Sequence, residues 1–289
     1  MLLPRLIARL DIKGPSVVKG IHMEGLRVVG RPHEMAKQYA EEADELLYID
    51  TVSSLYGRPQ LRSLLEKTCE TTFVPITVGG GIRSVEDVRE LLRSGADKCA
   101  INTAAIKDET LIQSIADTCG SQALVVSIEA KRSANSWEAL TDNGRERTGK
   151  DVVAWAARAV ALGAGEILLT SVDQDGTRRG FDLGLIRAVA RECPVPLVVS
   201  GGMGCIEHAV QAFQAGADAV AMASVLHYGK LTIQEVSDGI FAQGHIRAGR
   251  NSQAGGSASR SEGRISEEGE RERLRVDGLC GKGCPSLGR

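Results

Sequence analysis

The sequence has few aromatic residues, no long apolar run and almost no net charge, and each shortage narrows the class of protein. Aromatic residues make up 3% of the chain, so its core must be aliphatic, and the 43% of hydrophobic residues is ample for one. No apolar run reaches the roughly 18 residues of a membrane span, and the N-terminus shows no secretory signal pattern. The formal net charge of −2 gives no global positive field that would draw the chain to nucleic acid. We therefore expect a cytoplasmic protein that binds neither membranes nor nucleic acid.

The chain also lacks the cysteine and histidine spacing of a metal site. Its seven cysteines are scattered and odd in number, which in a reducing compartment favours small buried apolar residues over disulfides. Cys280 and Cys284 stand at CxxxC spacing without a neighbouring ligand, and the five histidines show neither metal spacing nor a serine partner. We expect no metal and no cofactor.

Short apolar runs alternate with amphipathic segments along the chain. The runs predict strands at Arg5–Asp11, Glu45–Asp50, Pro75–Gly79, Lys98–Ile101, Leu124–Glu129, Glu166–Ser171, Pro196–Ser200 and Ala219–Met222. In segments between them, such as 85–95 and 182–193, apolar residues recur at helical spacing. Eight strands alternating with helices indicate a parallel sheet, and the number eight favours closure into a barrel.

Two halves of the sequence resemble each other. GGGI at 79–82 matches SGGM at 200–203, and GADKCAINTA at 95–104 matches GADAVAMASV at 216–225. Both pairs are offset by 121 residues, a length that corresponds to four β/α units. The repeat predicts an α/β fold, a (β/α)8 TIM barrel with duplicated half-barrels. An open doubly wound sheet is the alternative, but it would not require the second half to echo the first.

We expect one barrel domain over residues 1–250 and a tail over residues 251–289. The tail is rich in Gly, Ser, Arg and Glu and shows almost no apolar periodicity, which is typical of a disordered segment. The chemistry should therefore reside in the barrel; the alternative for the tail is that it binds a partner.

Glycines and other small residues follow the predicted strands in two symmetric places. Glycine lets backbone N–H groups approach an anion, and barrels often bind phosphate after strands 7 and 8. One candidate phosphate site is Gly201, Gly202, Ala223 and Ser224, bordered by Asp175 and Gly176. The repeat predicts a second site at Gly80, Gly81, Asn102 and Thr103. Two such sites suit a long small-molecule substrate with a phosphate at each end. The alternative is that the glycines only make tight turns.

Two carboxylates end predicted strands that stand opposite each other in an eight-stranded barrel. Asp11 ends the first strand, and Glu129 ends the fifth. Two acids that flank a substrate can divide the roles of acid and base, so we predict that they are the catalytic pair. The alternative is that each pairs with the Lys two residues later, Lys13 or Lys131. Lys19, expected in the loop after the first strand, could hold a phosphate or orient an acid, or could simply be solvated.

Several longer runs resemble the cyclase subunits of imidazole glycerol phosphate synthases, a family of histidine-biosynthesis barrels. The resemblance extends from about residue 5 to about residue 236 and rests on RLIARLD, VVKG, TVGGGI, GSQALVVSIEAKR, GAGEILLTSVDQDGT and SGG. It implies an ammonia-dependent lyase that converts a phosphoribulosyl formimino-aminoimidazole carboxamide nucleotide to imidazole glycerol phosphate and aminoimidazole carboxamide ribotide. It also implies a heterodimer with a glutamine amidotransferase, which docks on the N-terminal face of the barrel and supplies the ammonia.

The resemblance also assigns roles to residues of this chain. Asp11 and Glu129 occupy the positions of the family's acid–base pair, and we expect Lys19 and Thr170 to position the substrate. The family has a ring of charged residues at the bottom of the barrel, where ammonia enters, and this chain matches it at Arg5, Glu45, Lys98 and Glu166. Because buried charges on barrel strands are otherwise costly, the four together suggest that the ammonia route is kept.

Two departures from the family pattern leave the substrate open. The run DIKGPSVVKG lacks the second Asp and the Arg that are usual there, and Arg9 stands where a small residue is usual. Glu129 replaces an Asp, which adds one methylene group, and a misplacement of about 1 Å can cost on the order of 100-fold in rate. The alternatives are a paralogue that cooperates with an amidotransferase in sugar amidation for surface polysaccharide, or a non-catalytic scaffold for that partner.

Overall fold

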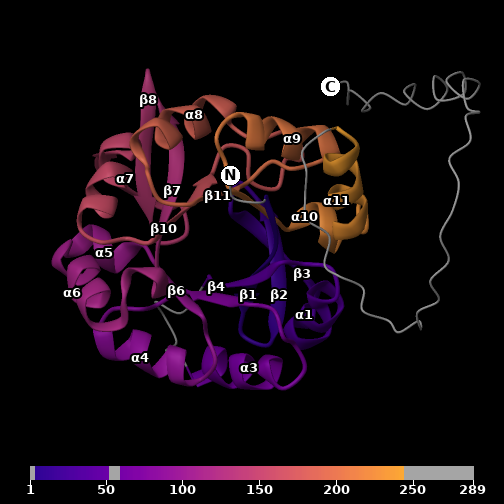
Figure 1. Ribbon diagram of the computed structural model, residues 1–289, viewed down its shortest axis with the longest axis horizontal. Coiled ribbons are helices and arrows are strands. Elements are labelled where there is room, and N and C mark those ends of the chain that lie inside the picture. Colours follow the sequence, from indigo (N-terminus) through magenta and orange to yellow (C-terminus); the bar gives the residue numbers. More distant parts are fainter. Residues whose placement is uncertain (1–3, 52–58, 244–289) are drawn as a thin grey trace, which may run out of the picture. The chain divides into compact units, whose positions relative to one another are not determined.

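Eight parallel strands close into a barrel in the computed structural model, which describes residues 4–51 and 59–243 (Figure 1). The strands are β1 (Arg5–Lys13), β4 (Glu45–Asp50), β5 (Ile76–Gly79), β6 (Lys98–Ile101), β7 (Leu124–Ser133), β10 (Glu166–Ser171), β11 (Leu197–Ser200) and β12 (Ala219–Met222). Each pairs in parallel with the next, and β12 pairs with β1 to close the circle. The predicted (β/α)8 barrel is therefore confirmed, and an open sheet is excluded. The tail expected over 251–289 lies outside the described residues.

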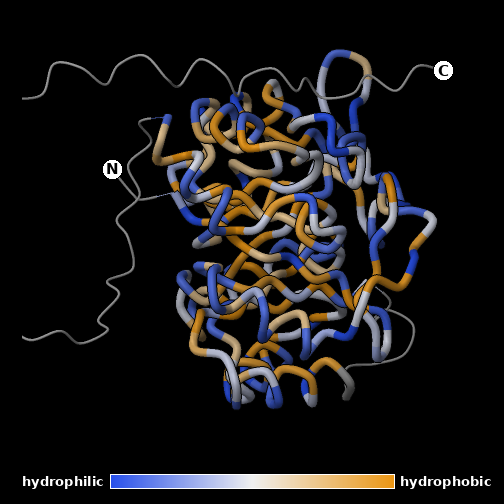
Figure 2. Tube along the Cα trace, turned by 90° about the vertical axis from the view of Figure 1, so that its right-hand side faces the viewer, coloured by the Kyte–Doolittle hydropathy of each residue, from blue (hydrophilic) through white to orange (hydrophobic). Residues whose placement is uncertain are grey.

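Helices surround this barrel (Figure 1). They are α1 (Pro32–Ala40), α3 (Pro59–Cys69), α4 (Val85–Arg93), α5 (Thr103–Lys107), α6 (Thr110–Cys119), α7 (Val152–Ala161), α8 (Leu183–Glu192), α9 (Ile206–Gln214), α10 (Ser224–His227) and α11 (Ile233–Ala242), with a 3-10 turn at Ser121–Ala123. Their apolar faces pack on the outside of the strands and form an aliphatic core. Hydrophobic segments accordingly run through the middle of the molecule in Figure 2. Among the described residues, no helix is long and apolar enough to cross a membrane.

Two of the barrel strands extend further than predicted. β4, β6, β10 and β12 have the predicted bounds, and β5 and β11 begin one residue later. β1 and β7, in contrast, continue past Asp11 and Glu129. The prediction that these acids end their strands is therefore wrong, because both strands run on into antiparallel hairpins.

The two hairpins stand at equivalent places in the two halves. β2 (Ser16–Ile21) and β3 (Glu24–Gly30) follow the first barrel strand, and β8 (Ser136–Thr141) and β9 (Glu146–Asp151) follow the fifth. Asp11 lies opposite Val18 on β2, and Glu129 lies opposite Leu140 on β8. Lys19 consequently lies on strand β2 and not in a loop as predicted.

The backbone before two short helices shows the same duplication. Asn102, before α5, has φ −132° and ψ −84°, and Ala223, before α10, has φ −132° and ψ −83°. Two residues separated by the repeat length thus share an uncommon conformation. Together with the paired hairpins, this agreement supports two half-barrels derived from one pattern.

The inside of the barrel is layered along its axis. Charged side chains occupy the first positions of several strands, at the amino end of the barrel. An apolar layer follows, formed by Ile7, Leu47, Ala100, Val125, Leu168, Val198, Ala219 and Ala221. Polar and charged side chains fill the carboxyl end. Such layers make the interior a packed core and not an open pore.

Candidate active site

Asp11 and Glu129 lie at the carboxyl end of the barrel, on strands four places apart in the circle of eight. Successive side chains of β1 and β7 point to opposite faces of the sheet, and this alternation directs both acids inward, above the apolar layer. Both are buried, with exposed fractions of 5% and 8%. Lys13 and Lys131, the partners proposed in the alternative interpretation, are exposed. The structure thus brings the two predicted acids into one mouth and does not pair them with those lysines.

Asp11 is held between two cations. The Nε atom of Arg9 donates a hydrogen bond to Asp11 Oδ1 at 2.8 Å, and Lys19 Nζ donates to Oδ2 at 3.3 Å. Burial by itself would raise the pKa of Asp11, but the charges of Arg9 and Lys19 outweigh burial and lower the pKa to about 2. Asp11 is therefore ionised at neutral pH and can accept a proton.

Glu129 has a different environment. Its Oε2 atom accepts a hydrogen bond from the backbone N–H of Gly144 at 2.7 Å. Burial raises the pKa of Glu129 to about 7, opposed by the Gly144 hydrogen bond and by the charge of Arg9, and assisted by Asp11 and Asp142. A large part of the Glu129 population therefore carries a proton at neutral pH. Two acids whose surroundings push their pKa values apart can serve as base and acid.

Lys19 and Thr170 are occupied by contacts with other side chains of the site. Lys19 Nζ donates to both carboxylate oxygens of Asp175 at 2.8 Å, besides its bond to Asp11. The hydroxyl of Thr170 accepts a hydrogen bond from Nη1 of Arg9 at 2.9 Å. Both side chains are buried, so Lys19 is not a solvated lysine.

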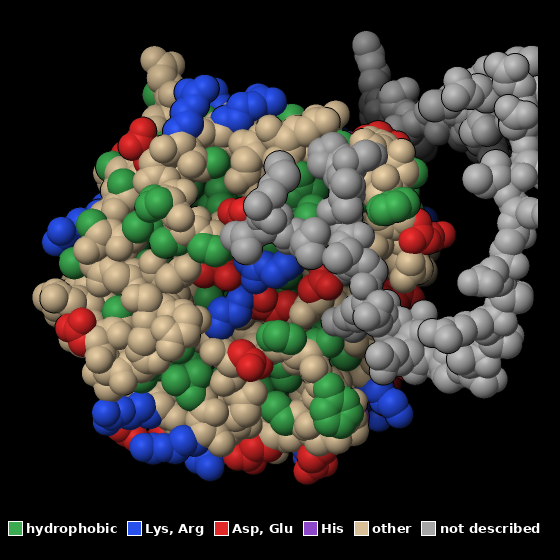
Figure 3. Space-filling model, in the orientation of Figure 1, with side chains coloured by type: hydrophobic (Ala, Val, Ile, Leu, Met, Phe, Trp, Pro, Cys, Tyr) green, Lys and Arg blue, Asp and Glu red, His purple; other side chains and the backbone are tan. Residues whose placement is uncertain are grey.

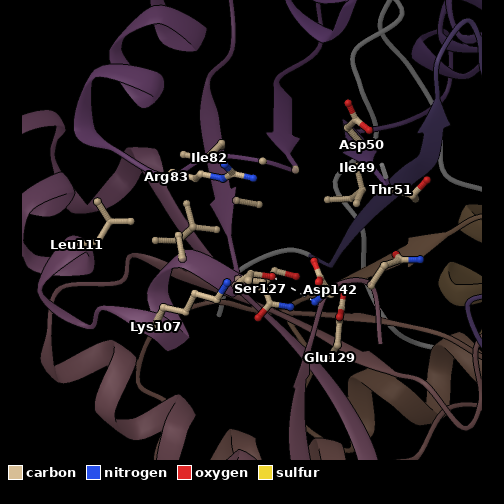
Figure 4. Close-up of a pocket in the computed structure, with 18 of the residues that line it drawn as sticks. Ile49, Asp50, Thr51, Ile82, Arg83, Lys107, Leu111, Ser127, Glu129 and Asp142 are labelled. Atoms are coloured by element: carbon tan, nitrogen blue, oxygen red, sulfur yellow. Dashed lines mark hydrogen bonds between the residues drawn. The ribbon is translucent and has the colours of Figure 1, made fainter. Parts of the chain in front are cut away.

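A cavity of about 650 Å³ lies beside Glu129 (Figure 4). Its lining includes the predicted phosphate residues Gly80, Gly81, Asn102 and Thr103. Three cationic side chains, Arg83, Lys107 and Arg145, also line it. These cations were not predicted from the sequence, because they stand in loops or at a helix end without a recognisable motif. Their charge suits an anionic ligand.

The second predicted phosphate site lies on the opposite half of the mouth. Gly201 and Gly202 have φ of 93° and 110°, in the region that favours glycine. A Cβ atom on Gly202 would lie 2.0 Å from the carbonyl oxygen of Gly180, so a side chain there would collide with the backbone. Gly176 similarly approaches the carbonyl of Gly20 on β2. These glycines bring the loops after β10 and β11 and strand β2 close together, and Ala223 and Ser224 follow β12.

The four residues of the predicted ring form one alternating network at the amino end of the barrel. Arg5 binds Glu45 at 3.0 Å and Glu166 at 3.1 Å, and Lys98 binds Glu45 at 2.8 Å and Glu166 at 3.1 Å. Each cation therefore contacts both acids. In Figure 3 acidic and basic side chains likewise gather at the centre of the barrel. Across the described ranges, no group of three or more His, Cys, Asp or Glu side chains is placed to hold a metal ion.

Fold and site together define the class of protein: a (β/α)8 barrel of duplicated halves with a candidate acid–base pair at the carboxyl ends of its strands. The chain belongs to the histidine biosynthesis protein family, whose sequence model matches residues 5–232.

Three relatives carry the same description, "Imidazole glycerol phosphate synthase subunit HisF". The protein from Legionella pneumophila is 62% identical over 70% of this chain and 97% of its own length. The proteins from Pyrococcus furiosus and Thermobifida fusca are 49% and 48% identical over 82% and 83% of this chain, and 94% and 97% of their own lengths. These similarities confirm the predicted enzyme, a cyclase subunit of the imidazole glycerol phosphate synthase type in histidine biosynthesis, and do not favour the sugar-amidation paralogue or the scaffold.

Proposed function

We propose that the chain catalyses the cyclase reaction in the mouth between Asp11 and Glu129, with Asp11 as general base and Glu129 as general acid. Ammonia that forms a bond to carbon must lose a proton, and the ionised carboxylate of Asp11 can take it. The nitrogen that leaves on cleavage must gain a proton, and the protonated carboxyl of Glu129 can supply it. The opposite displacement of the two pKa values is the observation that carries this assignment.

The two glycine-rich loop pairs would hold the phosphates of the nucleotide. Gly80, Gly81, Asn102 and Thr103 line the cavity together with Arg83, Lys107 and Arg145, which supports binding of one phosphate there. Gly201, Gly202, Ala223 and Ser224, in the site bordered by Asp175 and Gly176, would hold the other on the symmetric side. A phosphate at each end fixes a long substrate across the mouth, so that its reacting centre lies between the acids.

Ammonia would enter from the amino end of the barrel. The network of Arg5, Glu45, Lys98 and Glu166 stands at that end, and an apolar layer separates it from the acids. We infer that a glutamine amidotransferase docks over this network as the second subunit of a heterodimer and releases ammonia into the barrel. Small neutral ammonia can cross an apolar layer more easily than an ammonium ion can.

Turnover by the purified chain tests this proposal. With an ammonium salt and the formimino nucleotide, the chain should form both products without a partner. Asp11→Asn should lower kcat by about 10²–10⁴-fold, the contribution of a general base, whereas Asp117→Asn, on the exposed face of α6, should leave kcat unchanged. No turnover above background would contradict the proposal, and stimulation of a glutaminase without turnover would indicate a scaffold.

A further inference from the structure

Arg9 lies inside the barrel on β1, two residues before Asp11. Its side chain is 4% exposed and is directed inward from β1. Nη1 donates hydrogen bonds to Thr170 on β10 at 2.9 Å and to Ser200 on β11 at 3.2 Å, while Nε donates to Asp11. A buried guanidinium is costly unless it is paired and hydrogen-bonded, and Arg9 has both kinds of partner.

Arg9 reaches toward one half of the barrel, and the cavity beside Glu129 lies in the other half. The hydroxyl partners of Arg9 belong to β10 and β11. The cavity is lined by residues of β4, β6 and β7 and by the loops that follow β5, β6 and β8. Glu129 borders that cavity, whereas Asp11 lies on the side that Arg9 occupies. The guanidinium therefore makes the surroundings of the two acids unequal.

Asp11 contacts two cations, and Arg9 is less shared with other carboxylates than Lys19 is. Lys19 is 3.3 Å from Asp11 but binds both oxygens of Asp175 at 2.8 Å, so much of its charge is balanced there. Arg9 contacts Asp11 at 2.8 Å, and its other hydrogen-bond partners are neutral hydroxyls. Without Arg9, one lysine would have to balance two buried carboxylates. Under that condition a proton would bind to one of them more readily.

The remaining titratable groups around the pair do not replace Arg9. His227, from α10, faces Asp11 and Lys19, but burial lowers the pKa of His227 to about 4 and leaves it neutral. Glu129 faces the N–H of Gly144, the charge of Arg9, and two acids, Asp11 and Asp142. Among these groups only Arg9 acts on both acids as a cation.

We propose that Arg9 is a positioning residue that keeps the negative charge on Asp11 and leaves the proton of the pair on Glu129. This inference rests on the proposed function of the two acids. Arg9 would act through Asp11 and not through contact with the reacting atoms. Thr170 and Ser200 would hold the guanidinium in the orientation that directs Nε to the carboxylate.

The protonation of the resting protein tests this inference without substrate. The carboxyl carbons of Asp and Glu are labelled with ¹³C and titrated by NMR, with Asp11→Asn and Glu129→Gln assigning the two resonances. In the parent chain Asp11 should remain ionised down to about pH 4 while Glu129 titrates near neutrality. Arg9→Met should raise the pKa of Asp11 by about one unit or more. Arg9→Lys should restore part of the difference, and Arg62→Met, on the exposed face of α3, should change nothing.

An unchanged Asp11 titration in folded Arg9→Met would overturn the inference. If Arg9→Met does not fold, Thr170→Val provides the second variant, because it removes one hydrogen-bond partner of the guanidinium and keeps the charge of Arg9. The pKa of Asp11 should then rise by a smaller amount. No rise in that pKa would count against the inference. Below the new Asp11 pKa, kcat/KM of Arg9→Met should fall about tenfold per pH unit at fixed free ammonia. If the parent chain titrates as expected but shows no turnover, the proposed function is refuted and the role of Arg9 is not.

Discussion

At the scale of single residues, the length of Glu129 matches a backbone donor on the neighbouring hairpin. Glu129 Oε2 lies 2.7 Å from the nitrogen of Gly144. An Asp at the same position would end roughly one carbon–carbon bond short, about 1.5 Å, and would leave this N–H without its acceptor. The length of Glu129 is thus matched to this hydrogen bond.

Glu129→Asp should therefore impair the reaction. A displacement of the acid by more than about 1 Å should lower kcat on the order of 100-fold, with a small change in KM for the nucleotide. Steady-state kinetics with an ammonium salt measure both, and Glu86→Asp, at an exposed position of α4, is the matched control. Activity equal to or above that of the parent chain would show that the site tolerates either length.

The raised pKa of Glu129 should also appear in the pH dependence of stability. The pKa is about 7 in the folded chain against 4.5 for the free side chain. Between these values the folded state binds more protons than the unfolded state, so the free energy of unfolding should fall as pH rises and then level above about pH 7. Glu129→Gln should remove this decrease, which is on the order of 3 kcal/mol. Urea unfolding of both chains at pH 4.5 and pH 8 measures it; equal pH dependence would contradict the pKa shift.

At the scale of elements, the second hairpin completes the site of Glu129. Gly144 lies between β8 and β9 with φ 78°, and a Cβ atom there would lie 3.0 Å from Sδ of Met23. Gly144 is therefore placed by the hairpin turn, and the end of the first hairpin leaves little room for a side chain at this position. A change in this turn should move the N–H that Glu129 accepts.

Gly144→Ala should lower kcat more than a control variant with a similar loss of stability does. Alanine at positive φ costs about 1–2 kcal/mol, and the contact with Met23 should displace the N–H from Glu129. Gly149→Ala is the matched control, since Gly149 has φ 70° and nothing within 4 Å of its added Cβ atom. Thermal unfolding and kcat measure the two effects. If both variants lost the same activity, the Gly144 N–H would have no special role.

The elements also show where prediction from sequence succeeded and why it ended. The barrel strands were predictable because burial on both faces makes them continuous aliphatic runs. The hairpins were missed because β3 and β9 are mostly exposed, so they carry no apolar alternation. The acids, the glycines and the ring were predicted from the repeat and the resemblance. Contacts such as Arg9 with Thr170 and Ser200 were not, because they join residues 161 and 191 positions apart.

At the scale of the whole molecule, charge is concentrated at both ends of the barrel axis with an apolar layer between. Arg5 and Lys98 balance Glu45 and Glu166 at the amino end. Arg9 and Lys19 balance Asp11 and Asp175 at the carboxyl end. The separation of these networks supports a division between ammonia entry and chemistry.

Lys98→Met should impair the entry of ammonia more than the chemistry at the two acids. It would leave Glu45 and Glu166 with Arg5 as their remaining partner in the ring, which should lower stability by about 1–3 kcal/mol. Turnover driven by glutamine and an amidotransferase partner should fall several-fold more than turnover driven by ammonium salt. Lys67→Met, exposed on α3, is the control. An equal loss with both nitrogen sources would contradict a role of the ring in ammonia passage.

The most direct test of the account is the fate of ¹⁵N-labelled ammonium in the reaction catalysed by the purified chain. Mass spectrometry of the products should find the label in imidazole glycerol phosphate and none in the carboxamide ribotide. Asp11→Asn should form the labelled product about 10²–10⁴-fold more slowly. Absence of label from imidazole glycerol phosphate, or equal labelling by Asp11→Asn, would contradict an ammonia-dependent cyclase that works through the two acids of the barrel mouth.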